Sequence, residues 1–341
     1  MRLFFDPRQL AHAPAQEMHN GAFVPCAETP ARAAALCAAM DAPDLPTDHD
    51  EAPILAVHDA GYVEYLKTAH AAWTAAGRPG DVIGYVWPVV ARRNLNLTRI
   101  DALAGRYSMD SSTPLTADSW TSAYWSAQSA LSALDAVLAG DNVAVGLCRP
   151  PGHHAGADYL GGYCFINQAA VAAQAARDAG IARVAILDID YHHGNGTQDI
   201  FWERSDVFYA SVHADPATDF PFYWGHADEI GEGDGQGATL NLPLPQGTKI
   251  DAFRSAQATA LEAITRFDPG MLIVSFGADT FAGDPISHFA LQTEDYAVLA
   301  GDIAKTGFRT VILTEGGYAV DKLSENLASF LSGFRSSVKT V

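Results

Sequence analysis

The stretch VAILDIDYHHGNG, residues 184–196, decides the fold class of this 341-residue chain. Its first four residues are all apolar, which is typical of a strand buried on both faces of a parallel sheet. Acidic and imidazole side chains follow at once, and ligands of open α/β sheets bind at the carboxyl ends of strands. Because side chains alternate along a strand, Asp188, Asp190 and His192 share one side. The stretch therefore predicts a metal site at the end of a central strand.

Strand and helix signals alternate along the C-terminal two-thirds of the chain, which indicates a parallel sheet covered by helices on both faces. We expect five strands here, at 143–148, 184–190, 207–213, 272–279 and 310–315. Ala-rich helices are expected between strands, for example at 167–180 and 253–267. The N-terminal part is predicted to be mainly helical. Segment 78–118 has weak periodicity over a long stretch, which is typical of a functional loop such as a lid or a dimer contact.

Composition places the chain among ordinary globular proteins, with 48% hydrophobic and 18% charged residues. The length allows one large α/β domain or two smaller ones. No apolar run approaches the length of about 18 residues that a membrane span requires, and the first residues lack a signal-peptide core. The four cysteines form no CxxC pair, so we expect reduced thiols in a cytoplasmic protein.

The net charge is strongly negative, at −19, from 21 basic and 40 acidic residues. A field of this sign repels nucleic acid, and no nucleic-acid partner is expected. The same field either steers cations toward the protein or only maintains its solubility, and the charge count leaves both interpretations open.

Three further polar motifs stand at or just beyond predicted strand ends. The segment RPPGHHAG, 149–156, carries adjacent histidines, the segment SFGADTF, 275–281, carries Asp279, and EGGY, 315–318, ends on Tyr318. Groups at one edge of a sheet converge in space. Asp190, His192 and Asp279 would supply three nitrogen and oxygen ligands, as in a catalytic zinc site that leaves one position open. This ligand set also suits iron, cobalt or manganese.

Hydrolysis of an amide needs a general base, a general acid and an oxyanion stabiliser in addition to the metal. The tandem His153 and His154 suit the proton transfers. Asp188 and Asn195 are candidates for orienting the two imidazole rings through hydrogen bonds. Tyr318 follows two glycines and is a candidate donor to the oxyanion.

Together these motifs resemble those of the histone deacetylase superfamily, most closely its bacterial acetylpolyamine amidohydrolase branch. The matching segments span roughly residues 143–320 and are RPPGHHAG, GGYCFIN, DIDYHHGNGTQDIF, SFGADTFAGDPIS and EGGY. The resemblance implies one domain over residues 1–341 with an arginase–deacetylase type α/β fold. In this fold, a central and mostly parallel sheet of about eight strands is flanked by helices.

The resemblance also implies roles for the candidate residues. It implies one zinc ion per chain on Asp190, His192 and Asp279. It implies that His154 is the general base and pairs with Asn195. His153 is implied to be its electrostatic or acid partner and to pair with Asp188. Tyr318 is implied to polarise the scissile carbonyl. The resemblance implies a structural potassium ion beside the zinc, with ligands, partly backbone carbonyls, from Asp188, Asp190, His192 and Ser211. The walls of the substrate tunnel are implied to be Gly162, Tyr163, Phe220 and Ile286.

Segment 78–118 resembles the insertion that narrows the tunnel and builds a homodimer in polyamine-type members. Those members can place an acidic side chain there to bind the distal ammonium of the substrate. Ser112 stands at the aligned position of this chain. We therefore expect the nearby Asp101 and Asp110 to bind substrate in its place.

The predicted function is zinc-dependent deacetylation of acetylated polyamines or similar small cationic amides. One alternative is a deacetylase that acts on acetyl-lysine in proteins or peptides. A ureohydrolase with two manganese ions shares the fold but needs more Asp and His ligands than are visible. A non-catalytic protein that binds acylated amines is the third alternative. The sequence leaves open the acyl group, the amine and the metal used in the cell.

Overall fold

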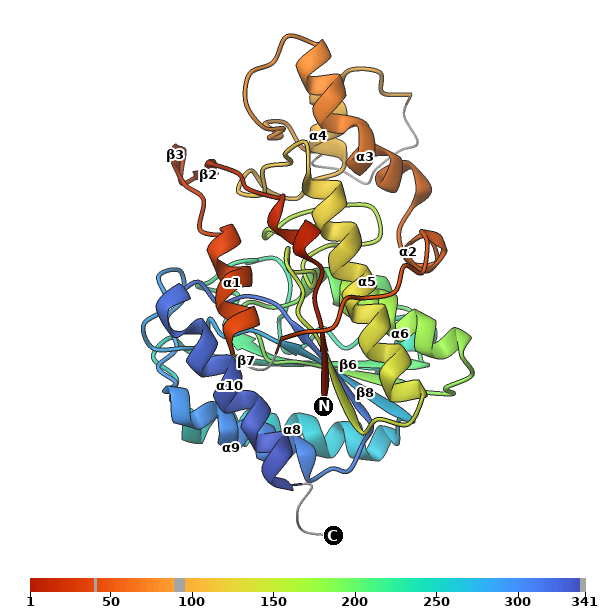
Figure 1. Cartoon of the computed structure of the whole chain (residues 1–341), viewed down its shortest axis with the longest axis vertical. Helices are drawn as coiled ribbons and strands as arrows, with labels where there is room; N and C mark the ends of the chain where they lie inside the picture. The colour runs from red at the N-terminus through yellow and green to blue at the C-terminus, as the bar shows by residue number, and fades with distance from the viewer. Residues whose placement is uncertain (40–41, 89–95, 338–341) are drawn as a thin grey trace.

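The computed structural model describes residues 1–39, 42–88 and 96–337. Its centre is a parallel seven-stranded sheet with the strand order β1-β4-β9-β8-β5-β6-β7 (Figure 1). The strands are β1 Arg2–Phe4, β4 Val143–Gly146, β5 Val184–Asp188, β6 Val207–Ala214, β7 Thr239–Leu244, β8 Met271–Phe276 and β9 Thr310–Thr314.

The central strands are buried along their whole length, as their uninterrupted apolar sequences predict. Strand β5 pairs with β6 on one side and with β8 on the other. This register places Asp188 level with Ser211 and Ser275. Polar side chains therefore begin at the same level on three neighbouring strands, at the carboxyl edge of the sheet.

Helices cover both faces of the sheet and form two hydrophobic cores with it (Figure 1). One face is covered by α5 Ser119–Leu138, α6 Gln168–Asp178 and α7 Asn195–Phe201. The other face is covered by α1 Pro30–Ala38, α8 Ile250–Phe267, α9 Thr293–Ala304 and α10 Val320–Ser337. Two short 3-10 helices lie at Pro7–Leu10 and Gly233–Gly235.

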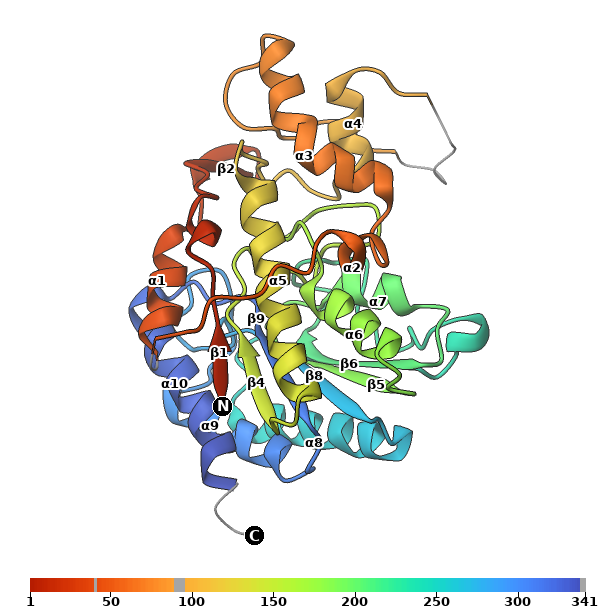
Figure 2. The same ribbon diagram turned by 45° about the vertical axis from the view of Figure 1, so that its right-hand side comes forward.

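An extension with a smaller core of its own lies at one end of the molecule (Figure 2). It contains α3 Ala60–Ala75 and α4 Ile100–Arg106, whereas the short helix α2 Ala52–Leu55 lies beside α6. An antiparallel hairpin lies near the extension and consists of β2 Gln16–His19 and β3 Ala22–Pro25. Helix α4 lies within segment 78–118, and residues 89–95 of that segment fall outside the described residues.

All five predicted strands are present; four of them end one to three residues earlier than predicted, and β6 ends one residue later. The α/β fold class is confirmed, but the described sheet has seven strands instead of about eight. Strands β1 and β7 and the hairpin were not predicted. Strand β1 is only three residues long, and β7 is an edge strand that contains a proline, so both give weak apolar signals. None of the described helices has the length and apolar character of a membrane span.

Candidate active site

The three predicted metal ligands converge at the carboxyl edge of the sheet. Asp190 and His192 follow β5, and Asp279 follows β8. One ligand atom from each residue lies within 4.8 Å of the others, and both carboxylates are buried. The Nδ1 atom of His192 lies 3.2 Å from Asp279 Oδ2 and 3.4 Å from Asp190 Oδ1. The structure therefore brings together the set that the sequence proposed.

This set fits a divalent cation. Burial and the nearby carboxylate of Asp190 raise the pKa of Asp279 to about 7, because two buried negative charges repel each other. A cation between them removes that repulsion, and oxygen and imidazole ligands suit zinc. Gly316 allows the close approach, since a Cβ atom at this position would lie 2.3 Å from Asp279 Oδ2. Its backbone N–H also donates to Asp190 Oδ2 at 2.8 Å.

The tandem histidines have different partners and opposite pKa shifts. His153 Nδ1 lies 3.0 Å from Asp188 Oδ2, and His154 Nδ1 lies 2.7 Å from Asn195 Oδ1. Burial alone would lower the pKa of His153, but the carboxylates of Asp190 and Asp188 raise it to about 10. Burial and the charges of neighbouring histidines lower the pKa of His154 well below its usual range. One imidazole is thus held charged and the other neutral, which suits an acid and a base.

The orientation of His154 follows from its bond to Asn195. The amide oxygen of Asn195 accepts a hydrogen bond, so Nδ1 of His154 carries the proton and Nε2 has a free lone pair. The amide nitrogen of Asn195 donates to Tyr159 Oη at 3.2 Å, which fixes the orientation of the amide. His154 is therefore prepared to accept a proton at Nε2.

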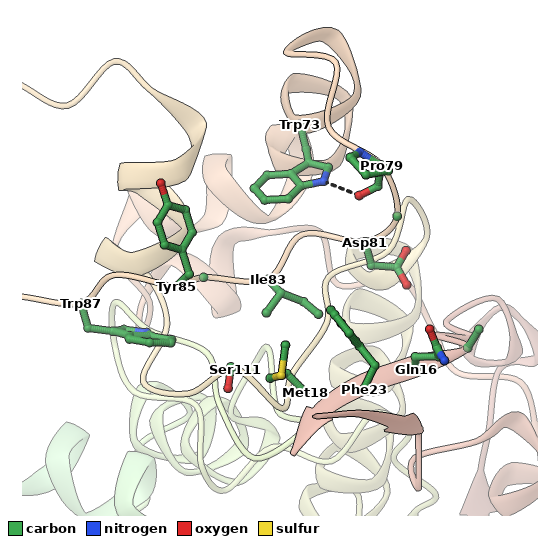
Figure 3. Close-up of a pocket in the computed structure, with 13 residues that line it drawn as sticks. Gln16, Met18, Phe23, Trp73, Pro79, Asp81, Ile83, Tyr85, Trp87 and Ser111 are labelled. Atoms are coloured by element: carbon green, nitrogen blue, oxygen red, sulfur yellow. Dashed lines mark hydrogen bonds between the residues drawn. The ribbon is translucent and has the colours of Figure 1, made fainter. Parts of the chain in front are cut away.

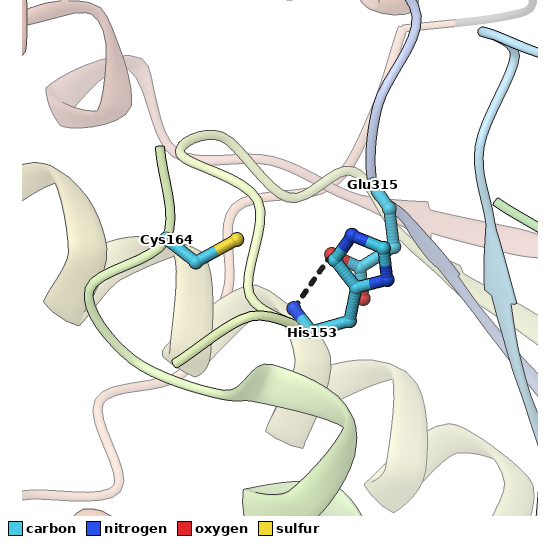
Figure 4. Close-up of side chains that lie close together, drawn as sticks. All are labelled: His153, Cys164 and Glu315. Atoms are coloured by element: carbon cyan, nitrogen blue, oxygen red, sulfur yellow. Dashed lines mark hydrogen bonds between the residues drawn. The ribbon is translucent and has the colours of Figure 1, made fainter. Parts of the chain in front are cut away.

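A buried glutamate behind the histidines, which the sequence did not single out, holds their backbone (Figure 4). Glu315 Oε2 accepts from the N–H groups of Gly152 and His153 at 2.7 and 3.2 Å, and Oε1 accepts from Ser275 Oγ at 2.9 Å. Cys164 also lies near His153 and Glu315. Burial raises the pKa of the Cys164 thiol far above its usual range, so it is a poor metal ligand. We assign Glu315 and Cys164 a structural role.

Tyr318 is held at the end of β9 by contacts to its backbone and ring. Its N–H donates to Asp284 Oδ2 at 2.6 Å. Arg32 of α1 donates to the carbonyls of Gly317 and Glu315 at 2.7 and 2.6 Å, and its guanidinium lies 4.7 Å from the centre of the Tyr318 ring. Burial raises the pKa of Tyr318 well above its usual range, so the hydroxyl keeps its proton. It is therefore available as a hydrogen-bond donor.

A cavity of about 370 Å³ opens above these groups. Its lining includes His154, His192 and Tyr318, and also all four predicted wall residues, Gly162, Tyr163, Phe220 and Ile286. Ser112 also lines it. We call this space the tunnel cavity.

The two aspartates expected to bind substrate are not among the residues that line the tunnel cavity. Asp110 accepts the N–H of Gly162 at 2.6 Å and so supports the wall from behind. Asp101 lies away from the tunnel cavity, and its role in substrate binding stays a prediction. Asp101 is 7% exposed and is bound by Arg78 and Arg99 at 2.5 and 2.6 Å, in a different cavity. The negative charge of Asp101 is thus neutralised by two arginines outside the tunnel cavity.

Glu17 is an acidic residue of the tunnel cavity that the sequence reading missed. It lies on β2, is 4% exposed, and accepts from Tyr163 Oη at 2.9 Å and from the N–H of Ala27 at 3.2 Å. The hairpin that carries Glu17 was not predicted, so this carboxylate was not expected at the tunnel cavity. The alternation of side chains along residues 16–19 is a weak local signal for the strand that carries it.

Comparison with known proteins identifies the family. The histone deacetylase domain matches residues 26–334. The chain belongs to the histone deacetylase family. It is 42% identical to acetylpolyamine amidohydrolase 1 of Pseudomonas aeruginosa, over 99% of this chain and 100% of the relative. It is 43% identical to the acetylpolyamine amidohydrolase of Mycoplana ramosa, over 98% and 99%.

Solved structures of this family have the same fold. A crystal structure of acetylpolyamine aminohydrolase from Burkholderia pseudomallei superimposes with a TM-score of 0.95 at 42% identity, covering 99% of each chain. The predicted deacetylase family and its hydrolase class are thereby confirmed.

The expected potassium ligands lie close together in this deacetylase, but their side chains already have partners. Asp188 Oδ2 accepts from Tyr209 Oη at 3.0 Å as well as bonding His153. Ser211 Oγ lies 2.8 Å from His213 Nδ1. A potassium ion here would therefore depend largely on backbone carbonyls, and it stays a prediction.

Proposed function

We propose that this chain removes the acetyl group from acetylated polyamines or similar small cationic amides with the help of one zinc ion. The main support for a cationic substrate is the position of Glu17, a buried carboxylate in the wall of the tunnel cavity. A buried carboxylate without a cationic partner is costly, and a substrate ammonium would supply that partner. The names of the relatives from Pseudomonas aeruginosa and Mycoplana ramosa support the same substrate class.

Asp190, His192 and Asp279 would hold the zinc ion, which when bound polarises the scissile carbonyl and activates water. The neutral His154 accepts the proton from the attacking water at Nε2. The charged His153 stabilises the negative charge that develops and is a donor for the leaving amine.

Tyr318 donates its hydroxyl proton in a hydrogen bond to the carbonyl oxygen, where negative charge develops. Glu17 pairs with the distal ammonium and so fixes the depth of the substrate in the tunnel cavity.

The proposal also includes a structural potassium ion, a cytoplasmic location and a homodimer that uses segment 78–118, all of which rest on the family resemblance.

Two substrates with the same four-carbon chain on the amide nitrogen test the role of charge. Acetylputrescine carries a terminal ammonium, and N-butylacetamide lacks it. We expect zinc-loaded protein to prefer acetylputrescine in kcat/KM. The E17Q variant should lose at least tenfold on acetylputrescine and less than about threefold on N-butylacetamide, because only the cationic substrate loses an ion pair.

Three results would contradict this proposal. Absence of hydrolysis by zinc-loaded protein would exclude the activity. An unchanged preference in E17Q would exclude the role of Glu17. Faster hydrolysis of an acetyl-lysine peptide than of acetylputrescine, measured in parallel, would favour the protein deacetylase.

A further inference from the structure

A second cavity, of about 600 Å³, lies on the opposite face of the β2–β3 hairpin (Figure 3). Met18 and its cross-strand partner Phe23 line it, whereas the next pair, Glu17 and Val24, lines the tunnel cavity. Segment 78–118, which the proposed homodimer uses, supplies most of the other residues around this space. That homodimer would cover its aromatic rings, so we assign no ligand to this cavity.

A chain of hydrogen bonds behind the catalytic groups joins the buried His154 to a carboxylate at the surface of the molecule. His154 Nδ1 lies 2.7 Å from Asn195 Oδ1, and Asn195 Nδ2 lies 3.2 Å from Tyr159 Oη. Tyr159 Oη in turn donates to Asp199 Oδ2 at 2.6 Å. The first three residues are buried, whereas Asp199 is exposed. The base is therefore connected to a group that does not belong to the site described so far.

Helix α7 and the turn after the tandem histidines build this chain of hydrogen bonds. Asn195 and Asp199 are four residues apart on α7, so their side chains share one face of the helix. The backbone N–H of Gly156 donates to the carbonyl of Tyr159 at 3.0 Å and closes the turn that carries the tyrosine. A Cβ atom at Gly156 would lie 2.2 Å from Tyr159 Cε1. The glycine thus leaves the space in which the tyrosine ring reaches both polar side chains of α7.

The direction of each hydrogen bond follows from the carboxylate at the end of the chain. An ionised carboxylate only accepts, so Tyr159 gives its single hydroxyl proton to Asp199. Tyr159 Oη then faces Asn195 as an acceptor, which directs the NH₂ group of Asn195 toward it and the amide oxygen toward His154. The proton of the neutral His154 therefore lies on Nδ1. Its Nε2 atom keeps the lone pair that a base needs.

The other acceptors near Asn195 are weaker than Tyr159. Asn195 Nδ2 also lies 3.4 Å from the carbonyl of His154 and 3.2 Å from Met109 Sδ. The first distance exceeds the usual range for an N–H donor, and a thioether is a weak acceptor. If the amide turned over, its NH₂ group would face Nδ1 of His154, and the imidazole proton would move to Nε2. The hydroxyl of Tyr159 therefore decides between a competent and an incompetent base.

We propose that Tyr159 and Asp199 are positioning residues that hold His154 in the tautomer of a base, acting through Asn195. Neither residue is among those that line the tunnel cavity, so they act without contacting substrate. The three hydrogen bonds point the same way along the chain and polarise one another. The proposal rests on the role of His154 as the base in the proposed function.

Nitrogen NMR of the full zinc-loaded chain, labelled at histidine, reports the tautomer without any need for hydrolysis. At pH 7 we expect the His154 signal, assigned by its loss in His154→Gln, to show the proton on Nδ1. Tyr159→Phe removes the acceptor for Asn195 and should populate the tautomer with the proton on Nε2. An unchanged His154 signal in Y159F would overturn the proposal, whether or not the protein cleaves acetylated amines.

Kinetics on acetylputrescine test the same chain through the reaction. Y159F should lower kcat at least tenfold and change KM less than twofold, because the substrate contacts stay in place. Asp199→Ala should lower kcat at least threefold. Asp199→Asn keeps an oxygen that accepts from Tyr159, so its kcat should stay within twofold of the unaltered protein. In an Asn195→Ala background, adding Y159F should change kcat less than twofold, since the connection to His154 is already broken.

Tyr124 and Asp48 provide the matched control. Tyr124, on α5 and outside the tunnel lining, donates to the exposed carboxylate of Asp48 in the same kind of bond. Tyr124→Phe should keep kcat within twofold, and thermal unfolding should show that both tyrosine variants are folded. Equal losses of kcat in Y124F and Y159F would overturn the proposal. A further tenfold loss on adding Y159F to Asn195→Ala would also overturn it, because Tyr159 would then act by another route.

Discussion

At the scale of single residues, the decisive feature is a pair of neighbouring histidines with opposite pKa shifts. Carboxylates face His153, whereas an amide oxygen faces Nδ1 of His154. The difference in partners, and not the residue type, separates the acid from the base. Partners can be guessed from sequence only when they are near a motif, as Asp188 and Asn195 are. Glu315 stands in the EGGY motif itself, but its contact to the histidine turn depends on strand pairing.

Two acidic residues, Asp101 and Glu17, show the same limit. Asp101 was chosen because its segment aligns with a substrate-binding insertion, but two arginines of that segment neutralise it. Glu17 was missed because its hairpin is short and distant in sequence from every motif. Sequence spacing identifies groups carried by adjacent parallel strands. It does not identify a group that reaches the same space from a separate hairpin.

Replacing Tyr318 by Phe removes one hydroxyl from the site. We expect kcat on acetylputrescine to fall by about 10²–10³-fold, because one oxyanion donor contributes roughly 3–4 kcal/mol. The unfolding midpoint should stay unchanged, since ring packing is preserved. Steady-state kinetics and thermal unfolding check this. Tyr223→Phe is the control, because Tyr223 is 81% exposed and outside the tunnel lining. Normal turnover in Y318F would exclude the role of the hydroxyl.

At the scale of elements, the parallel strands were predictable because each is a buried apolar run that ends in polar residues. The short edge strands and the hairpin lack that signal, since neither has two buried faces. The N-terminal segment was expected to be mainly helical, but it also supplies an edge strand and part of the tunnel wall. Those placements depend on tertiary contacts that leave no periodicity in the sequence.

A buried ion-pair network joins the N-terminal segment to the catalytic strands. Glu28, just before α1, accepts from Arg32 at 2.8 Å and from Arg149 at 2.8 and 2.9 Å, and all three side chains are fully buried. We expect Glu28→Ala to lower the free energy of unfolding by about 3–5 kcal/mol, because two buried arginines lose their counter-charge. Urea unfolding measures this change.

The matched control is Asp302→Asn, which removes a carboxylate from the more exposed pair with Arg254. It should change the free energy of unfolding by less than about 1 kcal/mol. Equal effects of the two substitutions would show that burial does not determine the contribution of these pairs.

At the scale of the whole molecule, buried histidines should lower the free energy of unfolding at mildly acidic pH. Burial lowers the pKa of His12 and of His58 from 6.5 to about 4. Between pH 6.5 and pH 4 these two histidines are protonated in the unfolded chain but not in the folded chain, so their contribution to the free energy of unfolding falls as the pH decreases. Each histidine contributes roughly 3 kcal/mol to this loss. Urea unfolding at pH 7 and pH 5 should show a smaller loss for His12→Gln than for the unaltered protein.

Metal removal should affect activity and stability together. We expect a chelator to abolish hydrolysis and lower the unfolding midpoint, because the buried carboxylates of Asp190 and Asp279 lose their counter-charge. At a free zinc concentration 100 times the dissociation constant, binding adds about 2.7 kcal/mol to the free energy of unfolding. One zinc ion per chain should restore both properties. Two tightly bound transition-metal ions per chain would instead favour the ureohydrolase alternative.

The hairpin between the two cavities limits how this chain can change in evolution. Its side chains alternate between an acidic residue facing one space and apolar residues facing the other. A single inserted or deleted residue in either strand would exchange the faces, because side-chain direction has a period of two. Substitutions can adjust either cavity separately, whereas a change in length would turn Met18 toward the tunnel and Glu17 away from it. We therefore expect related chains to vary in residue type along 16–25 but to keep the strand lengths constant.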